Sequence, residues 1–150
     1  MKLLLIFAVL LLKIPSGNHD IAIVRGLYQE AGNDKAKALK LIDQSKKERD
    51  NPVIRGYYGG GKMLMAKYGF NPLQKWNSFN EGRAILDSVI SANSMNAELR
   101  YIRLSIQLNA PSFLGYRKNI EQDKSYLIRT LPTIKDAQLK SIITLYIKSL

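Results

Sequence analysis

Three polar side chains, Arg100, Arg103 and Gln107, fall on one narrow stripe of a segment that is otherwise largely apolar. At about 100° per residue, the apolar residues of 97–108 cover most of a helix circumference, which predicts a central, buried helix. The arginine fork binds a carboxylate through two parallel hydrogen bonds and is always charged. The stripe is therefore a candidate binding site for an acidic group, on a peptide partner or elsewhere in the chain.

Asp123 offers these arginines an internal partner. The following helix has an apolar face that includes Asp123 and is formed by Tyr116, Ile120, Leu127 and Leu131. Because an aspartate on an apolar face needs a partner, we expect a structural ion pair between Asp123 and Arg100 or Arg103. The other arginine is then left for a ligand. Arg55 and Lys62, seven residues apart and so on one helix face, are expected to support ligand binding.

Residue patterns for catalysis or nucleotide binding are weak in this chain. The segment Gly56–Met63, GYYGGGKM, approaches the phosphate-loop pattern, but Met63 stands where that loop needs a hydroxyl and no buried strand precedes it. A helix with a glycine-lined face, packed closely against a neighbour, explains the glycines better. His19 is the only histidine, and there is no cysteine and no H-E-x-x-H motif. We therefore predict a non-enzymatic protein without a metal or cofactor.

Helix caps and breakers divide the chain into short helices. Asn51-Pro52 and Asn96 are typical helix starts, and Asn71-Pro72 repeats the Asn-Pro signal after a break. Ser78–Glu81 has capping-box spacing and is expected to open the helix that ends near Asn93. The segment Arg103–Asn109 alternates like a strand, but it lies within a helix-length segment bracketed by a cap and a proline. Trp76 is expected in a connection. Seven helices are predicted, at about residues 20–31, 34–46, 52–68, 78–93, 97–108, 116–130 and 133–149.

Short helices joined by tight connections pack as antiparallel hairpins. The residues Gly82, Leu86 and Val89, followed by the turn Ser94–Asn96, resemble the second helix of a tetratricopeptide (TPR) unit. The resemblance implies that Gly82 allows close approach of the preceding helix, and that Leu86 and Val89 face the hairpin core. We predict an all-α fold, a short TPR-like array of antiparallel hairpins with a C-terminal capping helix.

Two further segments, Gly56–Tyr68 and Glu98–Asp123, resemble a group of small, exported, helical-repeat proteins of Gram-negative bacteria. The resemblance covers most of the chain after its first residues. It implies a fold and export from the cytoplasm, and it implies no reaction.

The first residues have the order of a secretory signal peptide. A basic start at Lys2 is followed by the apolar run Leu3–Leu12 and then by small, turn-forming residues. The run is about half the ~20 residues that a spanning helix needs. We predict a signal peptide at residues 1–17, a helical domain at 18–150, and a periplasmic or secreted location.

The formal net charge is +11, which suits acidic partners or an anionic surface. Predicted export argues against nucleic acid, while a weak association with an anionic membrane surface is left open. We expect an exported interaction module that binds a peptide or protein in the periplasm. The alternative is a carrier of a small apolar or lipid-like ligand, with a closed cavity lined by Tyr57, Met63 and Met65.

Overall fold

The computed structural model describes residues 17–48 and 50–150, and the described part is all-helical. Most of the predicted signal peptide, residues 1–16, lies outside the described residues. Three short 3-10 turns accompany the helices, at Ala66–Tyr68, Ser112–Leu114 and Leu131–Thr133. The seven described α-helices are α1 (Gly17–Ala31), α2 (Lys35–Ser45), α3 (Pro52–Met65), α4 (Pro72–Ala92), α5 (Ala97–Asn109), α6 (Ile120–Thr130) and α7 (Ala137–Lys148).

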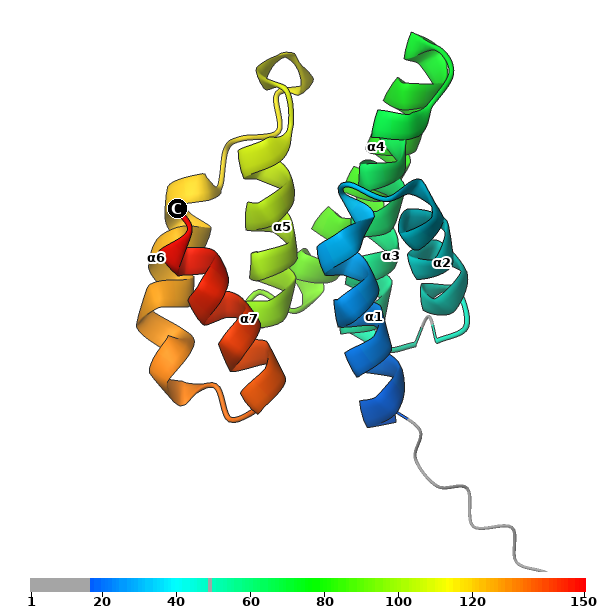
Figure 1. Cartoon of the computed structure of the whole chain (residues 1–150). Coiled ribbons are helices and arrows are strands. Elements are labelled where there is room, and N and C mark those ends of the chain that lie inside the picture. The colour runs from blue at the N-terminus through cyan, green and yellow to red at the C-terminus, as the bar shows by residue number, and fades with distance from the viewer. Residues whose placement is uncertain (1–16, 49) are drawn as a thin grey trace, which may run out of the picture.

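Consecutive helices alternate in direction, and α3 lies at the centre of the molecule (Figure 1). Helix α3 packs against α1, α2, α4 and α5, with its most extensive contact along α4. Helices α5, α6 and α7 form a second group that joins the first through α3 and α5 (Figure 1). The all-α class predicted from the sequence is confirmed.

The glycines of α3 allow the neighbouring helices to approach its backbone. A Cβ on Gly59 would lie 2.8 Å from the carbonyl oxygen of Gly82 in α4, closer than real Cβ atoms come. A side chain at Gly82 would in turn collide with the backbone of α3. All of Gly56–Met63 is helical, so the segment is a packing face and forms no phosphate loop. Gly82 is the close-approach position that the repeat pattern predicts.

Helix α4 corrects the sequence prediction around Trp76. The helix begins at Pro72, where the Asn71 side chain accepts the backbone N–H of Gln74 at 2.9 Å. Trp76 therefore lies inside a helix of 21 residues and not in a connection. Ser78 caps nothing, because its hydroxyl donates to the carbonyl of Lys62 at 2.7 Å. A proline at the first helical position was a stronger start signal than the capping-box spacing.

The C-terminal helices also begin later than predicted. Helix α6 starts at Ile120, since residues 112–119 form a 3-10 turn and a loop. Asp136 and not Thr133 caps α7, accepting the N–H of Leu139 at 2.9 Å. The segment 97–108 is helical as predicted, extending to Asn109.

Candidate functional site

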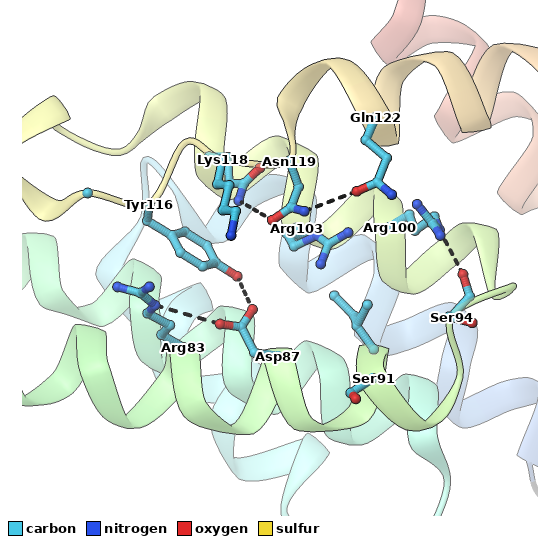
Figure 2. A pocket seen from close by; sticks show the side chains of 13 residues that line it. Arg83, Asp87, Ser91, Ser94, Arg100, Arg103, Tyr116, Lys118, Asn119 and Gln122 are labelled. Atoms are coloured by element: carbon cyan, nitrogen blue, oxygen red, sulfur yellow. Dashed lines mark hydrogen bonds and ion pairs between the residues drawn. The ribbon is translucent and has the colours of Figure 1, made fainter.

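An open cleft of about 460 Å³ lies between α4 on one side and α5 with the α5–α6 connection on the other. Figure 2 shows Arg83 and Asp87 of α4 on the side of Tyr116, with Arg103 of α5 across the cleft and Lys118 in the connection. Arg100 and Gln107 line the same cleft. The structure therefore gathers the three predicted residues of α5 around one cleft.

Asp123 is shared by two arginines. Its carboxylate is fully buried, and it accepts from Arg100 Nη1 at 3.0 Å. Arg103 binds the same carboxylate in a bidentate fashion, through Nε at 2.6 Å and Nη2 at 2.7 Å. The expectation that one arginine stays unpaired is wrong, because a buried carboxylate with two oxygens can accept from both guanidinium groups.

Sharing one carboxylate leaves both guanidinium groups with donors to spare. Arg100 also donates Nε to the Ser94 carbonyl at 2.8 Å and lies 4.2 Å from the ring centre of Tyr126. A guanidinium has five N–H donors, and each arginine uses only two of them within the described part of the chain. Arg103 Nη1 and Arg100 Nη2 are thus available to a bound acceptor.

The charge of Arg103 is secure at any physiological pH. Burial opposes the charged form, but the hydrogen bonds that Arg103 donates to Asp123 and the negative charge of Asp123 outweigh that effect, so the pKa of Arg103 is raised. Because the group is permanently protonated, it can act as a hydrogen-bond donor and never as a general base.

Gln107 contributes an acceptor without a partner. Its side chain is fully buried, and Nε2 donates to Asn119 Oδ1 at 3.5 Å. Gln107 Oε1 is the one buried side-chain oxygen or nitrogen in the described residues that has no hydrogen-bond partner. A buried polar atom left unsatisfied costs about 1–3 kcal/mol. Gln107 lines the cleft, so a donor that reached this buried acceptor from the cleft would satisfy it.

The α4 side of the cleft is held by Tyr116, whose hydroxyl donates to Asp87 Oδ1 at 2.7 Å. Burial and this hydrogen bond raise the pKa of Tyr116, which keeps the phenol protonated and donating. Arg83 lies 3.6 Å from Asp87 Oδ2, and its guanidinium stacks 5.0 Å from the centre of the Tyr116 ring. These contacts fix the carboxylate of Asp87 on the wall.

The cleft carries an excess of positive charge. Its cations are Arg83, Arg100, Arg103 and Lys118, against the carboxylates of Asp87 in the lining and Asp123 behind it. Lys118 is exposed and forms no ion pair with any described residue. A site with this excess of positive charge favours anionic ligands. Because Lys118 has no carboxylate partner among the described residues, a ligand would not have to displace one.

Arg55 and Lys62 do not belong to this cleft. Arg55 is exposed on α3, and Lys62 forms an ion pair with Glu81 of α4 at 2.9 Å. Neither residue lines the cleft. The structure therefore does not bring these two residues together with the stripe on α5.

A second buried network joins four helices and was not predicted. Arg25 of α1 binds Glu98 of α5 through Nε and Nη2, both at 2.7 Å, and both side chains are at most 5% exposed. Glu98 also accepts the hydroxyl of Tyr57 at 2.8 Å, while Arg25 Nη1 donates to Asp136 at 3.0 Å. This network spans residues far apart in sequence, and no spacing pattern could indicate it.

The lining of the cleft contains few groups that could act as a general acid or base. Its one acidic lining residue, Asp87, is held by Tyr116 and Arg83. Among the described residues, no group of three or more histidine, aspartate, glutamate or cysteine side chains is placed to hold a metal ion. The arrangement can bind an anion and a hydrogen-bond donor side by side.

Within the described part of the chain, none of the helices combines the length and apolar character needed to cross a bilayer. Comparisons with protein families, with curated proteins and with solved structures find no significant match to this chain.

Proposed function

We propose that this protein is an exported, non-enzymatic interaction module that binds an acidic segment of a peptide or protein partner in the α4–α5–α6 cleft. The buried, unpartnered Oε1 of Gln107 beside an excess of positive charge carries the proposal. A carboxylate would meet Arg103 and Lys118, and a neighbouring peptide N–H would donate to Gln107. A peptide supplies both groups within a few ångströms of one another.

We also propose that the helices form a TPR-like array of hairpins. The pairs α1–α2, α3–α4 and α5–α6 are each in contact, and α7 packs against α6 at the end of the chain. The directions of these helices alternate (Figure 1). In such an array the helices of successive hairpins present a surface for extended peptides, and the cleft opens beside α5.

The proposed periplasmic or secreted location rests on residues 1–17, whose order of basic, apolar and small residues resembles that of a signal peptide. Cell fractionation and N-terminal sequencing of the isolated protein test it. A mature N-terminus close to residue 18 in the periplasm or medium supports export, and an intact Met1 in the cytoplasm contradicts it.

The carrier alternative has less support than the cleft. Tyr57 and Met63 are at most 3% exposed and belong to the hydrophobic core. The Tyr57 hydroxyl is occupied by Glu98. These side chains therefore fill the space between helices that a carrier would need for its ligand.

Binding of a defined peptide tests the proposed site. The probe is a fluorescent hexapeptide of alternating glutamate and serine, and the control probe carries glutamine in place of glutamate. Lys118→Glu should weaken binding of the acidic peptide by about tenfold or more, because a charge-assisted hydrogen bond is worth about 1.5–3 kcal/mol.

Lys46→Glu is the matched control, since it makes the same charge change at an exposed position of the α2 C-terminus. Fluorescence anisotropy measures both affinities at one salt concentration. Equal loss in the two variants would mean that net charge alone attracts the peptide, and the cleft would no longer be the proposed site.

A further inference from the structure

The end of the α3–α4 hairpin exposes three large apolar side chains. Phe70 is 91% exposed, Leu73 67% and Trp76 50%. Every residue from Phe70 to Asn77 is exposed, and this end of the hairpin projects beyond the other helices, at the upper right in Figure 1. We call residues 67–77 the hairpin tip.

The three side chains lie close together in the chain. Leu73 and Trp76 are three residues apart on α4 and so occupy one side of the helix, and Phe70 precedes its N-cap, Asn71. Exposed apolar residues are ordinary when they are scattered, but a group of them rimmed by polar residues marks an interaction surface. The hairpin tip places three of them within seven residues.

The hairpin tip is basic and has no acidic residue, while the adjoining α1–α2 turn carries Glu30 and Asp34 beside Lys35 and Lys37. Residues 51–80 contain four lysine or arginine residues and no aspartate or glutamate. Lys67 and Lys75 belong to the hairpin tip, and Lys35 from the start of α2 lies 5.5 Å from the ring centre of Phe70. Lys67 Nζ donates to the Gly32 carbonyl at 2.8 Å, which brings the α1–α2 turn beside the hairpin tip.

We propose that the hairpin tip docks on the surface of an anionic phospholipid bilayer. Phe70, Leu73 and Trp76 enter the boundary between headgroups and acyl chains, where tryptophan is enriched in membrane proteins. The three lysines meet the lipid phosphates, with their aliphatic stems against the apolar side chains. Charge complementarity selects this occupant, because the acid-free stretch of chain matches a uniformly negative surface.

The docking is peripheral and independent of the α4–α5–α6 cleft. A few side chains at a hairpin end reach only the interface, and the attraction depends on anionic lipid and on ionic strength. The cleft and the hairpin tip involve different residues, so a partner and a membrane can be bound together. Failure of one proposal leaves the other intact.

Trp76 is the only tryptophan in the chain, so its fluorescence reports on the hairpin tip alone. The purified protein is titrated with vesicles of phosphatidylglycerol and phosphatidylcholine, and separately with phosphatidylcholine vesicles. We expect a blue shift of the emission and quenching by brominated acyl chains with the anionic vesicles only. We expect added salt to reverse both.

Two pairs of variants separate the apolar and the electrostatic contributions. Phe70→Ser/Leu73→Ser should abolish the quenching, whereas Met95→Ser should not, although Met95 is 77% exposed at the other end of α4. Lys67→Gln/Lys75→Gln should reduce partitioning by roughly 25-fold, since each lysine near an anionic surface contributes about fivefold. Lys46→Gln/Lys140→Gln makes the same change of charge elsewhere and should have a much smaller effect.

Circular dichroism of each variant is the control for intact helices. The proposal is overturned if anionic vesicles leave the Trp76 emission unchanged, or if both lysine pairs reduce partitioning equally. It is also overturned if the hairpin tip ignores vesicles but is required for binding a protein, which would assign the apolar patch to that protein.

Discussion

Replacement of Glu98 by leucine should destabilise the protein far more than an average substitution. Glu98 holds Arg25 by two hydrogen bonds of 2.7 Å, and both side chains are almost fully buried. Leucine leaves the Arg25 guanidinium buried with only Asp136 and Gln138 as acceptors. The Tyr57 hydroxyl also loses its acceptor.

Breaking a buried ion pair from one side costs about 3–5 kcal/mol. Because Asp136 still balances part of the Arg25 charge, we expect a loss of about 3 kcal/mol. That is a large part of the roughly 5–15 kcal/mol that stabilises a domain of this size. The same reasoning predicts that Arg25→Met/Glu98→Leu is more stable than Glu98→Leu alone, since the uncompensated charge is gone.

Urea unfolding monitored by circular dichroism measures these free energies, with Arg25→Met completing the double-mutant cycle. The structure requires a favourable coupling between the two positions. A Glu98→Leu variant that loses less than about 1 kcal/mol, or two single effects that simply add, would refute the buried network.

Three further predictions concern packing and pH. Gly59→Ala should lower the free energy of unfolding in urea by about 1–3 kcal/mol, because the added Cβ meets the α4 backbone. Gly26→Ala in α1 has open space around it and should raise that free energy by about 0.5–1 kcal/mol. A backbone hydrogen bond from Leu139 and the nearby Arg25 lower the pKa of Asp136. The stability that ionised Asp136 adds to the folded state should therefore be lost as pH falls below about 4. Asp136→Asn should make the free energy of unfolding depend less on pH in this acid range. Burial raises the pKa of Tyr28, Tyr57 and Tyr101. The free energy of unfolding should therefore fall as pH rises above about 10, where these phenols ionise in the unfolded chain. Absorbance at 295 nm should show them ionising only as the protein unfolds.

Much of the fold is predictable because its signals are local. Asn51-Pro52 and Asn96 start helices, and the cap of each accepts backbone N–H groups of the first turn. Two such signals disagreed at α4: the capping-box spacing at Ser78 predicted a later start, but the helix begins at Pro72 with Asn71 as its cap. The hydroxyl of Ser78 bonds the neighbouring helix instead, a tertiary contact that no sequence window contains.

Part of the candidate site follows from the sequence for a similar reason. An aspartate on an apolar helix face signals a buried partner, and Asp123 is fully buried between Arg100 and Arg103. The bidentate geometry depends on how α5 and α6 pack, so the sharing of one carboxylate between two arginines could not be predicted. The same is true of Tyr116, whose contact with Asp87 needs the loop before α6.

The pairing of Arg25, Glu98, Tyr57 and Asp136 could not be predicted from the sequence. These residues are on four helices or their caps, and Arg25 and Glu98 are 73 positions apart. Each resembles an ordinary surface or core residue when it is taken alone. An arginine in the apolar α1 segment was the only available signal, because a buried charge needs a partner.

The proposed binding of an acidic peptide in the α4–α5–α6 cleft is tested most directly by the side-chain amide signal of Gln107. A ¹H–¹⁵N spectrum is followed while the glutamate–serine hexapeptide is added, and the Nε signal of Arg103 is followed with it. We predict that both signals shift in a saturable way, and that Lys118→Glu suppresses the shifts. Saturable binding that leaves the Gln107 and Arg103 signals unmoved would contradict the proposed site.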